Sequence, residues 1–227
     1  MNAFGDAFVY LNDPFNWTRP GGILDLLVQH LRISALAVLL AAVLAVPAGV
    51  LLGRSGRGAG ALVVLSNVSR AVPTLALLTV LAVTPLGFSE TGTVLALAAF
   101  AVPPMLTNTY VGFREVDRDV REAARAMGMS RGQMLTRVEF PLALPLALPA
   151  FIAGLRIATV STVALVTVGV ITGNGGLGQL IIGGLNANFY RAEIVTGAVG
   201  CVLLAMVADV LLAGLERLLT PWTRAAR

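Results

Sequence analysis

The sequence predicts an all-α integral membrane protein with five transmembrane helices, its N-terminus outside and its C-terminus in the cytoplasm. Of the 227 residues, 57% are hydrophobic and only 12% are charged, whereas about a quarter of the residues in an average soluble domain are charged. The mean hydropathy is +0.85. Too few charged side chains are present to cover a soluble globule, so soluble proteins are excluded.

Five apolar segments are long enough to cross the hydrocarbon core, which takes about 20 helical residues. They cover residues 31–52, 61–86, 93–111, 142–171 and 194–215. Pro73 and two polar residues before it interrupt the second segment. We interpret its first third as a short helix near the interface and residues 72–86 as the deeper part. The pair Pro103-Pro104 breaks the third segment.

The orientation follows from the arginines, because arginine-rich loops stay in the cytoplasm. With the N-terminus outside, 12 of the 16 arginines fall on the inner side, three on the outer side and one, Arg156, inside the fourth segment. The predicted organisation is an outer segment, a membrane domain with a cytoplasmic loop, and a cytoplasmic tail. These parts are residues 1–30, residues 31–215 with the loop at 112–141, and residues 216–227.

The composition also restricts the chemistry open to the chain. All basic residues are arginine, and without lysine there is neither a P-loop lysine nor a Schiff base. The single His30 and the single Cys201 cannot build a zinc site or an internal disulfide. We therefore expect no metal, no cofactor and no catalytic set. His30 is interpreted as an interfacial side chain and Cys201 as a small buried apolar residue.

Charge is concentrated in one cytoplasmic block, residues 112–139, which holds 11 of the 28 charged residues. Asp117 is predicted to cap a helix over residues 118–127. Apolar residues recur along this helix at three- and four-residue spacing and form one stripe with charges opposite. The stripe consists of Val120, Ala123, Ala124 and Met127. Gly128 is predicted to end the helix in the left-handed conformation that glycine favours.

A second short helix follows Gly128, since Ser130 and Gln133 have the spacing of a capping box. Pro141 is predicted to separate it from the fourth segment, because proline lacks the N–H that a continuing helix needs. The two helices and the turn between them are called the knob. A loop lying on lipid headgroups is an alternative. A DNA-binding helix-turn-helix is rejected, and with it a nucleic-acid partner, because the second helix is short and enters a membrane span.

The knob carries a spaced motif that resembles the EAA loop of ABC-importer permeases. Glu-Ala-Ala at 122–124 is followed after three residues by Gly128, and after nine more by Val-Glu-Phe-Pro at 138–141. The family pattern is E-A-A, three residues, G, nine residues and I-x-L-P, so two apolar residues are exchanged for other apolar ones. Flanking segments resemble the permeases of osmoprotectant importers, which carry glycine betaine, choline or carnitine. These flanks are residues 108–112, 145, 154–156 and 173–178.

The resemblance implies a type I ABC importer permease fold in the bacterial inner membrane, surrounded by lipid. It implies a knob seated in a groove of a separate ATPase subunit, a second permease that is identical or related, and an extracytoplasmic substrate-binding protein. ATP hydrolysis then takes place on another chain, which agrees with the missing lysine, and this chain is not an enzyme. Transport of another small polar substrate, such as an amino acid, is the first alternative. An ATPase-independent secondary transporter or channel is the second.

The resemblance assigns the ATPase contact to the motif residues, and the charge pattern adds arginines at its rim. The motif residues are Glu122, Ala123, Ala124, Gly128 and Pro141, and the added arginines are Arg118, Arg121, Arg125 and Arg131.

Asp209 is the predicted counter-ion of Arg156, since a charge inside the membrane usually has a partner. That pair fixes helix packing or belongs to the pathway. Candidates for lining the pathway are Ser66, Asn67, Thr107, Asn108, Thr159 and Thr162.

Residues 173–178 match the dinucleotide fingerprint G-x-G-x-x-G letter for letter. That fingerprint requires a preceding strand and a following helix, whereas here a long membrane helix precedes it. We interpret these residues as a tight turn at the outer mouth.

An intramembrane enzyme is rejected because no catalytic set is present. The few aromatic residues at membrane depth indicate that an external binding protein selects the substrate.

Overall fold

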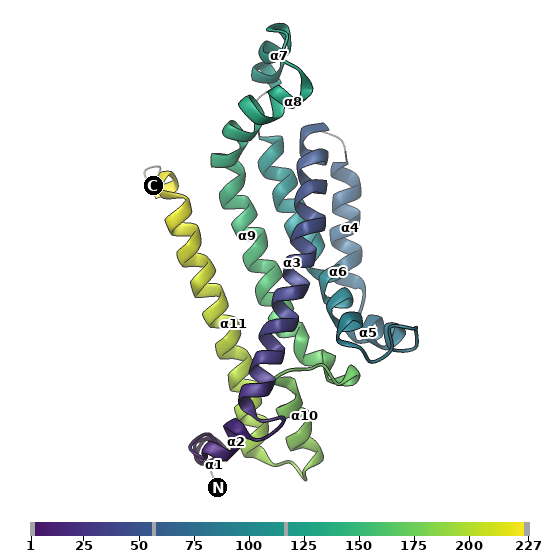
Figure 1. Ribbon diagram of the computed structural model, residues 1–227, viewed down its shortest axis with the longest axis vertical. Coiled ribbons are helices and arrows are strands. Elements are labelled where there is room, and N and C mark those ends of the chain that lie inside the picture. The colour runs from purple at the N-terminus through teal and green to yellow at the C-terminus, as the bar shows by residue number, and fades with distance from the viewer. Residues whose placement is uncertain (1–2, 56–57, 116–117, 225–227) are drawn as a thin grey trace.

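The computed structural model describes residues 3–55, 58–115 and 118–224, which form helices and no strand. Four helices in these ranges are long and apolar enough to cross a membrane. They are α3 (Ile23–Ser55), α6 (Glu90–Arg114), α9 (Phe140–Val166) and α11 (Arg191–Leu219). They run along one axis as an elongated bundle (Figure 1). The first of them starts at Ile23 rather than at residue 31, because Ile23 and Leu26 are buried against the α10–α11 region.

Two short helices, α4 (Ala59–Ala71) and α5 (Thr74–Ala82), are together long and apolar enough for a fifth, bent span. The two meet at an angle of 80°. Pro73 lacks an N–H and holds Val72 in an extended conformation, with φ of −73° and ψ of 120°. The predicted division of this segment into two parts is therefore present, and α4 runs along the bundle whereas α5 turns across it (Figure 1).

Small residues let α3 and α6 approach each other closely. Residues at four-residue spacing along α3 are all buried, and they are Ala37, Ala41, Ala45, Gly49 and Gly53. A Cβ on Gly49 would lie 2.7 Å from Thr109 Cβ, and one on Gly53 would lie 2.8 Å from Phe113 Cβ. In a membrane, such contact between backbones replaces the hydrophobic driving force of soluble cores.

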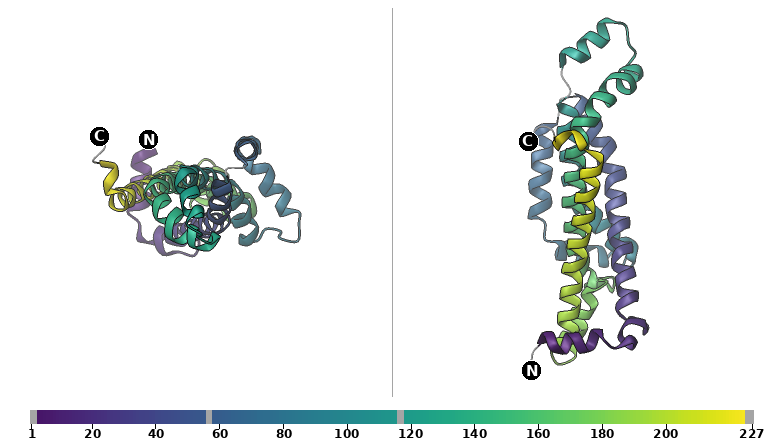
Figure 2. Two further views of the ribbon diagram at one scale, coloured as in Figure 1. Left: turned by 90° about the horizontal axis from the view of Figure 1, so that it is seen from above. Right: turned by 90° about the vertical axis from the view of Figure 1, so that its left-hand side faces the viewer.

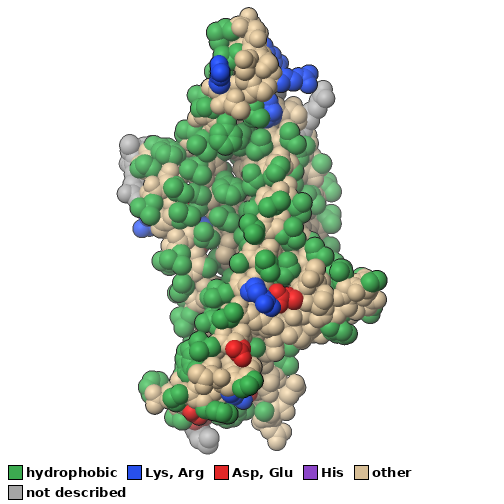
Figure 3. Space-filling view, viewed as in Figure 1, with side chains coloured by type: hydrophobic (Ala, Val, Ile, Leu, Met, Phe, Trp, Pro, Cys, Tyr) green, Lys and Arg blue, Asp and Glu red, His purple; other side chains and the backbone are tan. Residues whose placement is uncertain are grey.

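The two ends of the bundle differ in character. At one end α1 (Ala3–Leu11), α2 (Pro14–Thr18) and α10 (Gly178–Asn186) lie near the N-terminus (Figure 2). At the other, α7 (Arg118–Ala126) and α8 (Arg131–Met134) project beyond the remaining helices. Figure 3 shows hydrophobic side chains along the bundle and basic ones gathered at this projecting knob. The knob end is therefore cytoplasmic, in agreement with the arginine distribution.

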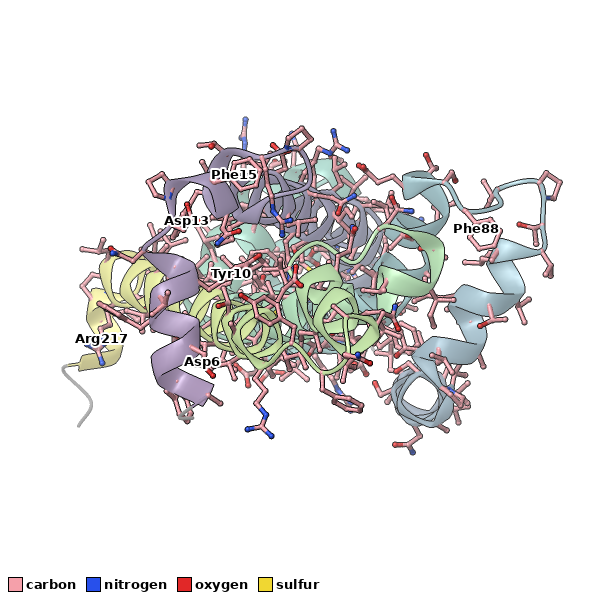
Figure 4. All side chains as sticks on the ribbon, turned by 90° about the horizontal axis from the view of Figure 1, so that it is seen from below. Asp6, Tyr10, Asp13, Phe15, Phe88 and Arg217 are labelled. Carbon is pink, nitrogen blue, oxygen red and sulfur yellow. The ribbon has the colours of Figure 1, made fainter. Side chains whose placement is uncertain are left out.

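A polar contact fastens α1 to the outer end of α11. Tyr10 points from α1 into the bundle (Figure 4), and its hydroxyl accepts a hydrogen bond of 2.9 Å from Arg19 Nη2. Arg19 also pairs with Glu193 at 3.3 Å. Burial, together with the Glu193 carboxylate, raises the pKa of Tyr10 above its usual range. The phenol therefore stays protonated, and α1 is held against the outer end of α11.

Candidate coupling knob and transport pathway

The turn between α7 and α8 has the predicted geometry. Gly128 has a φ of +77° and open space where a Cβ would lie, and its N–H donates to the Arg125 carbonyl at 2.9 Å. Ser130 and Gln133 form both hydrogen bonds of a capping box. Asp117, the predicted cap of the first helix, lies outside the described residues. A left-handed glycine therefore reverses the chain, and a capped helix starts immediately after it.

The apolar stripe of α7 is mostly exposed. Ala124 is 1% exposed, whereas Met127 is 70% exposed and Val120 and Ala123 are also exposed. Because α7 projects beyond the bundle, Ala124 is the one buried residue of the stripe, and the rest of this apolar face is left uncovered by the described residues. Glu122, Arg125 and Arg131 are exposed as well. The outer face of the knob is thus mixed apolar and charged, as at the surface of a protein–protein contact.

Arg121 was predicted at the rim of the knob, but it turns inward. Its Nη1 donates to the Arg54 carbonyl at 3.1 Å and its Nη2 to the Phe113 carbonyl at 2.9 Å. These two carbonyls belong to the last turns of α3 and α6, where helical acceptors have no partner of their own. The side chain of Arg118, the other rim arginine at the start of α7, lies outside the described residues. Arg121 therefore connects the knob to the ends of α3 and α6.

Below the knob lies a buried acid that the sequence analysis missed. Glu139 is 2% exposed, and its carboxylate pairs with Arg54 and, at 3.7 Å, with Arg121 Nε. The one signal in the sequence is its place between the apolar Val138 and Phe140. A charge inside an apolar motif needs a partner, but the sequence pattern does not say which arginine provides it.

Pro141 does not end the helix that precedes it. From α8 the chain continues through a π turn (Leu135–Glu139) into α9, with the Phe140 N–H donating to the Leu135 carbonyl five residues back. A wider turn at this position relieves the clash that proline causes with the carbonyl four residues before it. The predicted separation at Pro141 is wrong, and the knob is joined to the membrane by continuous helix.

A hollow of about 640 Å³ lies on the flank formed by α4, α6 and α9. Four predicted pathway residues line it, namely Ser66, Asn67, Thr107 and Asn108. Thr162, by contrast, is 1% exposed and packed between helices, and Thr159 does not line the hollow. Pro103 and Pro104 line it as well, and their missing N–H groups leave two helical carbonyls without donors. Irregular backbone of this kind is tolerated at membrane depth only beside protein or a water-filled cavity.

Arg156 and Asp209 face each other between α9 and α11. Arg156 Nε donates to Asp209 Oδ1 at 3.0 Å and Nη2 to Oδ2 at 3.1 Å, a two-point contact. Its Nη1 reaches Glu216 Oε2 at 3.1 Å. A second, smaller hollow between the two helices is lined by this pair. One guanidinium thus holds two carboxylates that lie two helical turns apart on α11.

Asp209→Asn is expected to lower the free energy of unfolding in detergent by roughly 1 kcal/mol, because the two-point ion pair becomes a single hydrogen bond from the guanidinium to a neutral amide oxygen. Glu216→Gln neutralises a one-point contact with the same guanidinium and should lower the free energy of unfolding less. The thermal unfolding midpoints of the two variants give the comparison. An Asp209→Asn protein that unfolds with the wild type would show that the pair does not fix helix packing.

The glycine-rich segment folds back against α3 at the outer end. Gly176 has a φ of +50°, and a Cβ there would lie 2.6 Å from His30 Cβ. His30 was predicted to be interfacial but is fully buried. The Leu177 N–H donates to its Nδ1 at 3.3 Å, so Nε2 carries the proton and donates to the Val163 carbonyl at 2.9 Å. The turn is hence part of the packed core, because its backbone donors satisfy a buried imidazole.

No cluster of three or more metal-ligating side chains occurs among the residues that the structure describes. Cys201 is half-buried and packs beside the apolar cluster at the outer end. The polar groups that stand out are therefore those of the knob, the buried ions beneath it and the two hollows.

Comparison with known proteins places this geometry in a family. Residues 45–225 match the model of the "Binding-protein-dependent transport system inner membrane component" family. The chain is 39% identical over 193 residues to the carnitine transport permease protein OpuCD of Listeria monocytogenes, covering 85% of this chain and 84% of the relative. It is 38% identical over 199 residues to the choline transport system permease protein OpuBD of Bacillus subtilis, covering 88% and 86%.

The fold is also that of a solved importer. The MetNI methionine ABC transporter, in an inward-facing conformation, contains a chain that matches with a TM-score of 0.71 at 23% identity, over 92% of this chain and 99% of that one. This likeness confirms the five-crossing permease fold that the spans and the motif predict. The chain therefore belongs to the binding-protein-dependent transport system inner membrane components, the membrane-spanning permeases of ABC importers.

Proposed function

We propose that this chain is the permease subunit of an ATP-driven importer for quaternary-amine osmoprotectants such as glycine betaine, choline and carnitine. The observation that supports this substrate class is the hollow on the flank of α4, α6 and α9. None of its described lining side chains is charged, and hydroxyls and amides share it with the ring of Phe100; the ring of Tyr110, which also borders it, is buried and faces the Arg114 guanidinium. Aromatic faces attract quaternary ammonium groups, while an arginine in the lining would repel them. Relatives with 33% to 39% identity are permeases for carnitine, choline and other osmoprotectants.

The hollow is open on the flank of the bundle, so a second permease, identical or related, would close it into a pathway. Substrate would be delivered at the outer end by a separate binding protein. In this arrangement the chain supplies the passage and the binding protein supplies most of the selectivity. Alternating access would then expose the hollow to one side of the membrane at a time.

The conformational change driven by ATP would reach the permease through the knob. Its outer face exposes Glu122, Ala123 and Met127 on a helix that extends beyond the bundle. A groove on an ATPase subunit could receive this short, convex element, with Arg125 and Arg131 at the rim. Closure of the ATPase pair would move the knob, and the continuous helix from α8 into α9 would carry that movement into the membrane.

The test is uptake into proteoliposomes that contain the permease, its ATPase and its binding protein. With ATP on the cytoplasmic face, labelled choline or glycine betaine should accumulate, and without ATP uptake should fall to the level of empty liposomes. Unlabelled carnitine should compete, whereas methionine should not. Accumulation without ATP would favour a secondary transporter, and competition by amino acids alone would favour a different substrate class.

A further inference from the structure

We propose that Glu139, Arg54 and Arg121 are positioning residues that transmit movement of the knob to α3, α6 and α9. This buried ion cluster lies on the cytoplasmic side, between the knob and the membrane helices. The proposal rests on the proposed function, since it concerns how a transport step is coupled to an ATPase. It assigns the transmission to three side chains, none of which is part of the exposed face of the knob.

The cluster joins four elements of the fold. Glu139 closes the π turn at the start of α9, Arg54 belongs to the last turn of α3, and Arg121 comes from the middle of α7. The carboxylate pairs with both guanidinium groups. Arg121 in addition reaches the backbone carbonyls of Arg54 and, in the last turn of α6, Phe113. The four helices that meet here are therefore connected by one carboxylate and two guanidinium groups.

The knob makes few other contacts with the bundle. Apart from these ionic contacts, α7 packs mainly against α8 and the π turn, and most of its surface is exposed. The side chains of Glu139 and Arg121 are only 3% and 11% exposed. The orientation of α7 relative to the membrane helices thus depends on contacts that are directional and shielded from water. Hydrogen bonds from a charged group are strong in such surroundings.

An ion cluster suits transmission better than an apolar contact would. Removing one partner leaves an uncompensated buried charge, so the arrangement tends to be either fully formed or broken rather than gradually loosened. Two discrete arrangements are what a switching element requires. A movement of α7 that is imposed from outside must therefore pull the ends of α3, α6 and α9 with it, or break the cluster.

The experiment measures uptake and ATP hydrolysis together in proteoliposomes that contain the complete complex. Glu139→Gln should lower the number of substrate molecules imported per ATP by roughly fivefold or more, which is the range of coupling effects between sites. ATP hydrolysis should continue, since the outer face of the knob is unchanged. Arg137→Gln is the matched control, because Arg137 is an exposed residue of the same π turn, and it should retain the wild-type ratio.

Arg54→Lys is the second variant, because it preserves the charge and the fold but not the shape of the guanidinium fork. Arg54→Lys should likewise lower the number of substrate molecules imported per ATP. Glu139→Gln and Arg54→Gln are also measured singly and combined. The fold-decrease in substrate imported per ATP in the double variant should be smaller than the product of the two single fold-decreases, since both substitutions act through one cluster. Wild-type ratios in both Glu139→Gln and Arg54→Lys would overturn the proposal.

A readout independent of transport separates this proposal from the proposed function. In a Cys201→Ser background, spin labels at Ala126→Cys on α7 and Leu51→Cys on α3 report the distance between the knob and the bundle. The wild type should give one narrow distance distribution, and Glu139→Gln a broader one, whatever the substrate. An unchanged distribution would overturn the cluster's role even if uptake works. A broadened one in a complex without ATP-driven uptake would overturn only the proposed function.

Discussion

Gly128→Val in the knob is expected to reduce ATP-driven uptake by at least about tenfold while the membrane bundle still folds. Gly128 has a φ of +77°, and nothing lies within 4 Å of where its Cβ would be. The cost is therefore conformational rather than steric, because a β-branched L-residue is strongly disfavoured in the left-handed region. The turn must rearrange, and α7 no longer presents Glu122 and Met127 in the orientation that its partner requires.

The same substitution at Gly132 is the control. It too has open space around the position of a Cβ, but it lies inside α8 with ordinary helical geometry. Valine there is tolerated at least as well as glycine, whose helix propensity is poor. Uptake per mole of folded complex should fall only for Gly128→Val. Equal uptake by the two variants would show that the geometry of the turn does not matter for coupling.

Gly112→Val is expected to prevent the bundle from assembling. A Cβ at this position would lie 2.4 Å from Ala147 Cα and 2.5 Å from its Cβ, where α6 crosses α9. The neighbouring atoms are backbone and the first side-chain carbon, so no flexible group can move aside, and separating the helices costs several kcal/mol. Almost no monodisperse protein should be recovered on size-exclusion chromatography after detergent extraction.

Gly214→Val provides the comparison within the membrane. Gly214 lies in α11, and nothing occurs within 4 Å of its hypothetical Cβ. The two variants add the same side chain to a membrane helix and differ only in the neighbour that it meets. Normal recovery of Gly214→Val beside the loss of Gly112→Val would confirm the close crossing, whereas normal recovery of both would contradict it.

The features that depend on local pattern could be predicted from the sequence. Apolar length predicted the crossings, arginine placement predicted their direction, and the capping pair around Gly128 predicted the turn of the knob. The crossings and the turn depend on residues within a few positions of one another, and the direction depends on the count of arginines on each side of the membrane. The family motif added what spacing alone does not contain, namely that an ATPase is the expected partner of the knob.

The errors concern partners that are distant in the chain. Arg121 faces inward because the ends of α3 and α6 leave carbonyls unpaired next to it, and His30 is buried because the turn after Val166 folds back onto it. Pro141 is accommodated by a π turn, which depends on how α8 and α9 are held. Arg54 and Leu177 are distant in sequence from the side chains they contact, and the π turn next to Pro141 is set by how the two helices are held, so neither periodicity nor residue type could reveal these features.

In the proposed function the ATPase binds the exposed face of the knob, and the amount of ATPase that co-purifies with an affinity-tagged permease measures this contact. Glu122→Arg combined with Met127→Asp changes only exposed side chains, so the bundle should fold as before. We expect the wild type and the Arg137→Gln control to retain the ATPase and the double variant to lose it. Equal recovery of the ATPase on the double variant would contradict the account, because the binding surface would then lie elsewhere on the chain.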